Sequence, residues 1–249
     1  MKNHATKTAL RKIYAKLFKE FGPQRWWPAR TKFEVIVGAI LTQNTSWGNV
    51  EKAIQRLKAA GVLSERALRD IPAAKLAALI KPAGYFNVKT RRLKNFMRFF
   101  FDEYHGSLKA MAREELPQMR YKLLKVNGIG PETADSILLY ALGKPVFVVD
   151  AYTKRFLYRH NLVDHKVGYH RVQELFMSAF DHDVAMFNEY HALIVALGKN
   201  FCRPRPLCEA CALNNVCYSL SSKCNSCHRA LLDGEKRVAT KSGFLCLDC

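Results

Sequence analysis

The chain has 249 residues, 49% of them hydrophobic, which suffices for one large domain or for one domain with an appendage. Lys and Arg number 40 against 21 Asp and Glu, and the net charge of +19 favours a polyanionic partner, although a merely basic or ribosome-associated protein would share it. No apolar run is long enough to span a membrane, and Met1–Leu10 is too polar for a signal peptide, so we expect no membrane association.

Most of the chain is expected to form helices separated by proline and glycine. Apolar residues recur at helical spacing over residues 6–21, and Gly22-Pro23 ends this segment. Thr31 and Glu34 form a capping box that opens a second helix. Further helices are expected over residues 64–70, 73–80, 89–104, 151–160, 169–180 and 184–199. No strand pattern precedes residue 222, so the fold class predicted for residues 1–217 is all-α.

The helix expected over residues 89–104 carries a run of cations. Lys89, Arg91, Arg92 and Lys94 lie on or near the face opposite its apolar residues. A solvated charge run is the default interpretation of such a face, and a DNA-facing edge is the alternative.

The three tryptophans stand in unusual places. Trp26 and Trp27 are adjacent and precede Pro28, and two adjacent indoles cannot both face one core from a helix. One of them is therefore a candidate for a pocket wall, unless both pack between domains. Trp47 follows a polar turn that contains Gln43.

Residues 121–150 contain the strongest local pattern. Gly128-Ile129-Gly130 predicts a tight hairpin between two helices, the second of which begins at Pro131. A glycine hairpin that opens a helix points unpaired N–H groups outward, where they suit a phosphate oxygen. An apolar run then leads to a single carboxylate, Asp150. Taken alone, the hairpin is an ordinary helical turn and Asp150 is a helix N-cap.

The combination of LxxVxGIGxxTA, an apolar run and VDxYxxR resembles the helix-hairpin-helix, Gly/Pro-rich loop and aspartate signature of the endonuclease III-like DNA glycosylase superfamily. The resemblance covers roughly residues 5–217. It implies a six-helix subdomain at about 31–140, a second subdomain built from 1–30 and 141–201, and a cleft between them that receives an everted nucleotide. The DNA-binding residues that it implies are Gln43, which fills the gap in the DNA stack, and Asn127, Gly128, Ile129, Gly130 and Thr133.

The same resemblance implies the chemistry. Glycosyl transfer from a nucleoside passes through an oxocarbenium-like state, which the Asp150 carboxylate would stabilise while it orients or deprotonates water. Lyase members of the superfamily carry a Schiff-base lysine two residues after the second hairpin glycine, where this chain has Glu132. We therefore expect a monofunctional glycosylase without β-lyase activity. His191, in a later helix, is expected to be a satisfied interior histidine.

The tryptophan segments indicate the base that is removed. Alkylated purines such as 3-methyladenine carry positive charge, which an electron-rich indole face attracts. Trp26-Trp27-Pro28 and the segment that ends at Trp47 resemble the base-pocket segments of the endonuclease III-like 3-methyladenine glycosylases. We expect excision of 3-methyladenine, with 7-methylguanine as a further substrate. The alternatives are a mismatch or oxidised-base glycosylase of the same fold and a non-catalytic DNA-structure binder, which would need neither Asp150 nor an aromatic pocket.

All eight cysteines lie between Cys202 and Cys249, a clustering that indicates metal rather than the dispersed disulfides of secreted proteins. The spacing of the first four, in the loop 202–217, suits either zinc or a [4Fe–4S] cluster. The superfamily resemblance implies the cluster, although its usual first interval is six residues and here it is five. The ligands of this quartet are Cys202, Cys208, Cys211 and Cys217.

The second quartet has the two-knuckle spacing of a zinc ribbon, which we expect over residues 222–249. Turn residues separate short β-prone pieces between its knuckles, among them Arg237 to Thr240. Its ligands are Cys224, Cys227, Cys246 and Cys249. One [4Fe–4S] cluster and one Zn²⁺ are thus expected in a monomeric, cytoplasmic protein that associates with the nucleoid.

Overall fold

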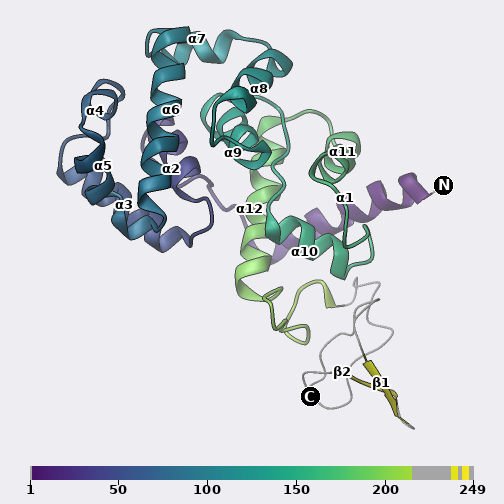
Figure 1. Ribbon diagram of the computed structural model, residues 1–249. Helices are drawn as coiled ribbons and strands as arrows, with labels where there is room; N and C mark the ends of the chain where they lie inside the picture. The colour runs from purple at the N-terminus through teal and green to yellow at the C-terminus, as the bar shows by residue number, and fades with distance from the viewer. Residues whose placement is uncertain (1, 215–236, 241–242, 247–249) are drawn as a thin grey trace. The chain divides into compact units, whose positions relative to one another are not determined.

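The computed structural model describes residues 2–214, 237–240 and 243–246, and the chain forms two compact units (Figure 1). One unit comprises Trp27–Val148, and the other comprises Met1–Trp26 together with Val149–Cys249. Every regular element within residues 2–214 is a helix, which confirms the all-α expectation. Among the described helices, none combines the length and the apolarity needed to cross a bilayer.

The unit Trp27–Val148 begins with a well-capped helix. Thr31 Oγ1 accepts the N–H of Glu34 at 3.1 Å, and the Glu34 carboxylate accepts the N–H of Arg30 at 3.2 Å, so the capping box is present with its second bond one residue earlier. The elements of this unit are α2 (Lys32–Leu41), α3 (Trp47–Ala59), α4 (Glu65–Asp70), α5 (Ala73–Leu79), η1 (Lys81–Ala83), α6 (Phe86–Tyr104), α7 (Leu108–Arg113), α8 (Leu116–Lys125), α9 (Pro131–Ser136) and η2 (Ile137–Ala141).

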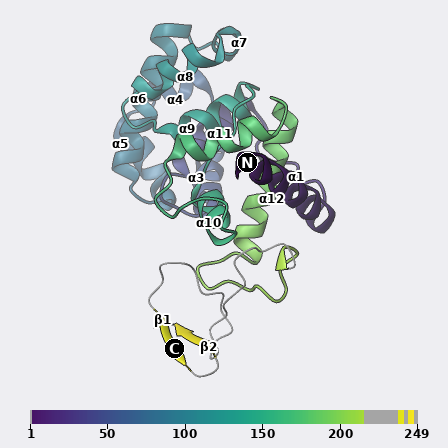
Figure 2. The same ribbon diagram turned by 90° about the vertical axis from the view of Figure 1, so that its right-hand side faces the viewer.

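Helix α6 lies beside α2, α4 and α5 (Figures 1 and 2). Its apolar face, with Leu93, Phe96 and Phe100, is buried as predicted. The placement of Lys89 on the opposite face is wrong, because its side chain is only 1% exposed. The Lys89 ammonium donates to the carbonyls of Leu41 at 2.8 Å and Ala83 at 2.6 Å. Helix-end carbonyls lack partners within their own helix, so they accept this buried cation.

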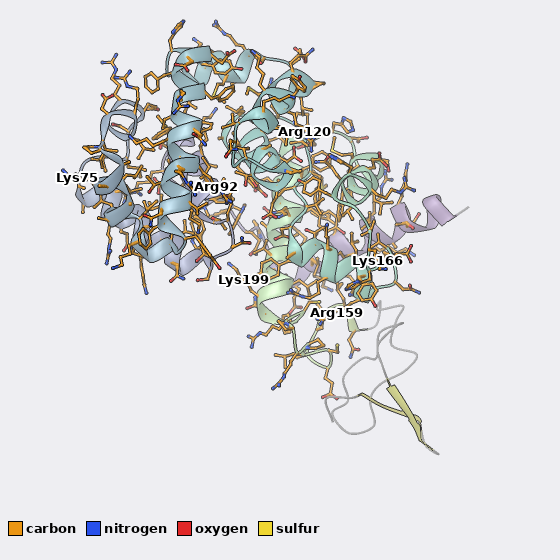
Figure 3. All side chains as sticks on the ribbon, viewed as in Figure 1. Lys75, Arg92, Arg120, Arg159, Lys166 and Lys199 are labelled. Atoms are coloured by element: carbon orange, nitrogen blue, oxygen red, sulfur yellow. The ribbon has the colours of Figure 1, made fainter. Side chains whose placement is uncertain are left out.

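The turn between α8 and α9 is the predicted glycine hairpin. Gly128 has φ 97°, and a Cβ there would stand 2.3 Å from Cγ of Arg92, so the position requires glycine for both conformation and space. The Arg120 guanidinium donates two hydrogen bonds, of 2.7 and 3.1 Å, to the fully buried Asp135 carboxylate (Figure 3). This ion pair joins the two hairpin helices, α8 and α9.

The other unit packs α1 (Lys2–Phe21) against α11 (Tyr169–Ala179) and α12 (Val184–Asn200), as Figure 2 shows. Tyr190 is completely buried and donates its hydroxyl to the Leu10 carbonyl at 2.9 Å. Helix α10 (Ala151–Arg159) lies on α12, where Gly198 gives space to Tyr152: a Cβ at Gly198 would stand 2.3 Å from the tyrosine ring.

Two short strands lie in the segment predicted to form a ribbon. β1 (Arg237–Thr240) pairs antiparallel with β2 (Gly243–Cys246), and Arg237 stands opposite Cys246. The expected strand over Arg237 to Thr240 is thereby confirmed. The cysteines Cys217, Cys224, Cys227 and Cys249 lie outside the described residues.

Candidate functional site

The unit Trp27–Val148 brings Gln43 onto the glycine hairpin. The Gln43 amide donates to the Gly128 carbonyl at 3.0 Å and to Thr133 Oγ1 at 2.8 Å. Its carbonyl oxygen accepts a bond from the Arg92 guanidinium, which projects from α6 (Figure 3). The structure therefore groups three of the residues predicted to bind DNA, and it adds Arg92 as the residue that orients Gln43.

The other hairpin residues hold the turn in place or begin the next helix. Ile129 is 4% exposed and anchors the turn in the core, so its side chain is not available at the surface. The Asn127 carbonyl accepts the Asn95 side-chain amide at 3.1 Å, which ties the hairpin to α6 a second time. Gly130 is extended, with φ −91°, and caps α9 ahead of Pro131.

Three aromatic rings cluster in the same unit. The Trp27 and Trp47 centroids are 5.2 Å apart with an interplanar angle of 86°, an edge-to-face pair. Tyr140 joins them, with its centroid also 5.2 Å from that of Trp27. Sequence reasoning missed Tyr140, because its position in an apolar helix marks it as a core residue. Pro28, next to Trp27, is exposed.

Trp26 belongs to the other unit and has a different neighbour. The Lys199 ammonium lies 5.6 Å from the centroid of its ring, a cation–π contact from α12 (Figure 3). Of the tryptophans predicted to line one pocket, the structure thus brings Trp27 and Trp47 together and pairs Trp26 with a lysine.

Asp150 caps α10 and faces a histidine. Its Oδ1 accepts the N–H and the hydroxyl of Thr153 at 2.7 and 2.8 Å, so the expected N-cap is present. Its Oδ2 lies 3.6 Å from Nε2 of His191, an ion-pair separation longer than a direct hydrogen bond. The two side chains are 13% and 6% exposed, which confirms that His191 is an interior histidine.

The surroundings of Asp150 act on its charge in opposite directions. Burial raises the pKa of Asp150, but the facing His191 and the two hydrogen bonds from Thr153 lower it, and the net effect is a pKa below the usual aspartate value. The carboxylate is therefore ionised at neutral pH, and its Oδ2 is not engaged by the cap.

The cysteine loop follows α12 directly. Cys202 is buried, and Cys208 and Cys211 are half-buried. Arg159 at the end of α10 donates to Cys202 Sγ at 3.5 Å, and Arg155 donates to the Cys202 carbonyl at 2.8 Å (Figure 3). Among the described residues, no group of three or more His, Cys, Asp or Glu side chains is arranged to hold a metal ion.

The sequence matches the model of the HhH-GPD superfamily of base excision DNA repair proteins over residues 37–182. A protein of Methanocaldococcus jannaschii, provisionally named a DNA repair glycosylase, is 47% identical over 210 residues, which cover 84% of this chain and 95% of the relative. Endonuclease III of Thermotoga maritima is 28% identical over 189 residues, covering 74% of this chain and 82% of that enzyme.

Two solved structures extend the comparison. The 3-methyladenine DNA glycosylase of H. pylori bound to 1,N6-ethenoadenine superposes with a TM-score of 0.65 at 29% identity, covering 80% of this chain and 98% of that one. An endonuclease III trapped covalently on DNA superposes with a TM-score of 0.73 at 22% identity, covering 85% and 95% of the two chains. The second match shows the shared fold.

The effect of His191 on the Asp150 carboxyl is testable. In His191→Gln the opposing effect of the histidine is lost while burial persists, so the Asp150 pKa should rise. A depressed carboxyl pKa contributes stability above the unfolded-state value of about 3.9 and loses it as pH falls. On acidification, the variant should therefore lose this contribution to stability at a higher pH than the wild type does. Carbon-13 NMR titration of the Asp150 carboxyl measures the shift.

The exposed His170→Gln serves as control. An unchanged Asp150 titration in His191→Gln would show that the histidine does not set the charge of Asp150.

Proposed function

Because the chain belongs to the HhH-GPD superfamily of base excision DNA repair proteins, we propose that it is a monofunctional DNA glycosylase that excises alkylated purines. The substrate we assign is 3-methyladenine in double-stranded DNA, with 7-methylguanine as a second. The observation that carries this assignment is the aromatic cluster of Trp27, Trp47 and Tyr140. The 29% identity to a 3-methyladenine glycosylase over nearly all of that enzyme supports it.

The aromatic cluster suits a cationic base. N-alkylation at position 3 or 7 places positive charge on the purine ring, and indole faces attract such a cation more strongly than a neutral ring. The same charge makes the base a good leaving group, so the protein needs no acid to protonate it. A cluster of three aromatic rings therefore favours alkylated purines over neutral oxidised bases.

Asp150 supplies the charge that the reaction requires. As the N-glycosyl bond breaks, the deoxyribose acquires oxocarbenium character, and a fixed carboxylate stabilises that cation without having to reorganise. The Oδ2 of Asp150, which the helix cap leaves unused, is the atom that we assign to this role and to orienting the attacking water. His191 acts as a positioning residue that keeps the carboxylate ionised.

Glu132 argues against lyase chemistry. A lyase step needs an amine that forms a Schiff base with C1′ of the sugar. Glu132 is the second residue of α9 and is exposed. By the sequence resemblance, it stands where lyase members carry that amine, and its carboxylate cannot form a Schiff base. The product that we propose is an intact strand with an abasic site.

The hairpin and Gln43 form the DNA-binding element of the proposal. Backbone N–H groups at the start of α9 suit a phosphate, and Asn127, Gly128, Ile129, Gly130 and Thr133 form this turn. Gln43 would occupy the space of the everted nucleotide. To do so its amide must exchange the bonds to Gly128 and Thr133 for bonds to the remaining base.

The cysteine quartets complete the proposal. We assign Cys202, Cys208, Cys211 and Cys217 to a [4Fe–4S] cluster that cross-links the loop after α12. The guanidinium of Arg159 donates to Cys202 Sγ at 3.5 Å and so supports the assignment, because hydrogen bonds to the sulfur ligands are typical of iron–sulfur sites. We assign Cys224, Cys227, Cys246 and Cys249 to a zinc ion. The antiparallel pair β1 and β2 supports a ribbon, since Cys246 ends the second strand.

Asp150→Asn tests the catalytic assignment. The substitution keeps the size and the cap acceptor but removes the charge, so excision of 3-methyladenine should fall roughly a thousandfold or more. Binding to an abasic-site analogue should change little. Single-turnover excision and fluorescence anisotropy measure the two effects, with the exposed Asp164→Asn as control. Excision by Asp150→Asn at near the wild-type rate would remove the assigned role.

Substitutions in the aromatic cluster test the substrate. Trp27→Leu and Trp47→Leu keep apolar volume but remove the ring, and cation–π attraction of up to ~2 kcal/mol corresponds to a loss of roughly tenfold or more for 3-methyladenine. A neutral lesion should lose less, and the corresponding Phe variants should recover part of the rate. Oligonucleotides with a methylated purine, thymine glycol or an abasic site, resolved with and without alkali, provide the measurement. Preference for thymine glycol, or cleavage without alkali, would return the protein to oxidised-base or bifunctional chemistry.

Metal analysis tests the cofactors. Protein prepared without oxygen should be brown and contain about four iron atoms and one zinc atom per chain, one group for each thiolate quartet. Cys208→Ser should lose iron and keep zinc, whereas Cys227→Ser should do the reverse. Two zinc atoms and no iron in the wild type would contradict the cluster assignment.

A further inference from the structure

A basic groove runs along α6 beside the glycine hairpin. It has a volume of about 670 Å³, and no carboxylate is among its lining residues. Four cations of α6 line it together with two residues of the hairpin: Arg91, Arg92, Lys94, Arg98, Asn127 and Gly128. We refer to this feature as the α6 groove. All of its walls belong to the unit Trp27–Val148.

Two of the four cations already have protein partners. The Lys94 ammonium donates to the carbonyls of Leu68 at 3.2 Å and Arg69 at 2.7 Å, and so joins α6 to the end of α4. Arg92 donates to Gln43 and packs its methylene groups against Gly128. Arg92 thus connects the groove to the hairpin, and Lys94 connects it to α4.

The other two cations have no such partners. Arg91 and Arg98 are exposed, and within the described part of the chain neither makes a hydrogen bond or an ion pair. Four like charges on two turns of one helix repel one another and weaken it. A solvated charge run usually alternates with acids, which would relieve that repulsion, and the groove offers none. The groove therefore favours an anionic ligand.

The spacing of the two arginines fits a nucleic-acid backbone. Seven residues of helix correspond to a rise of about 10.5 Å. Successive phosphates of one DNA strand lie further apart than the rise of 3.4 Å per nucleotide along the duplex axis, so a span of this length lets two long arginine side chains reach two different phosphates of one strand. The hairpin lies at the edge of the groove, because Asn95 of α6 donates to the Asn127 carbonyl at 3.1 Å. A strand that contacts the hairpin would continue directly along Arg91 and Arg98.

We propose that the α6 groove binds the phosphodiester backbone of the DNA strand held by the hairpin, and that Arg91 and Arg98 each neutralise one of its phosphates. This inference rests on the DNA binding of the proposed function, but not on its chemistry. The contact is independent of sequence, because only phosphates are touched. It would extend the footprint beyond the hairpin and retain the protein on undamaged DNA during a search for lesions.

The salt dependence of binding tests the proposal. Affinity for a duplex with an abasic-site analogue falls with salt with a slope of about 0.9 per neutralised phosphate. The double variant Arg91→Gln with Arg98→Gln should therefore reduce the magnitude of the slope by about two. The control pair, Arg56→Gln with Arg113→Gln, removes the same charge from exposed positions on α3 and α7. If both pairs reduced the salt slope equally, the effect would come from net charge alone, and the proposal would be overturned.

Neutral phosphates identify the contacts directly. Methylphosphonate substitution, scanned along the strand, should weaken wild-type binding at two additional positions of the same strand, one for each arginine. The same substitutions should have no effect on the groove variant, since its arginines are gone. Identical profiles for the two proteins would contradict the proposal.

Titration with inorganic phosphate and with a nucleoside triphosphate distinguishes DNA from a small anion. Tight binding that requires Arg91 and Arg98 would make this a small-anion site and refute the DNA assignment. None of these experiments measures excision. They therefore test the groove even if the protein binds DNA without cleaving the glycosyl bond.

Discussion

A buried carboxylate remains ionised only when positive charge and hydrogen-bond donors replace the water that it has lost, and Asp150 depends on this compensation. Thr153 provides two donors to one oxygen and His191 faces the other. The same arrangement has two consequences. The cap starts α10, and so fixes the position of the carboxylate, while the second oxygen is left outside the cap and is the atom that we propose to face a cationic transition state. The structural role and the proposed chemical role are compatible in one side chain, because they use different atoms.

Helix α6 has a comparable position in the unit Trp27–Val148. Lys89 donates hydrogen bonds to the carbonyls at the ends of α2 and η1, and burial lowers the pKa of its ammonium to about 8. From the side, Arg92 orients Gln43 and covers Gly128. A single helix therefore sets the relative positions of the Gln43 turn and the hairpin. This arrangement explains why cations that look like a solvated face have different environments: one is buried, and of the four that line the groove, two join the helix to its neighbours and two are exposed.

Local patterns in the sequence predicted the helices, the Thr31 cap, the glycine hairpin and the Asp150 cap, because each depends on neighbouring residues alone. The contacts of Lys89, Tyr140 and His191 escaped prediction for the opposite reason. The Lys89 carbonyl partner at Leu41 is 48 positions away, and Asp150 and His191 come from different helices. A lysine in a basic run also resembles its exposed neighbours, and only the packed unit shows that helix ends converge on it. The family assignment needed the combined motif, since the hairpin alone occurs in many helical proteins.

We propose that an aromatic cluster and an ionised aspartate make this superfamily member a glycosylase for alkylated purines. The most direct measurement is chromatography of the free bases that the purified protein releases from genomic DNA treated with a methylating agent. The account predicts that 3-methyladenine is released, with 7-methylguanine as a further product, and that the DNA strand stays intact until alkali is added. Release of oxidised or mismatched pyrimidines from suitably damaged DNA, with no methylated purine released from the alkylated sample, would contradict it.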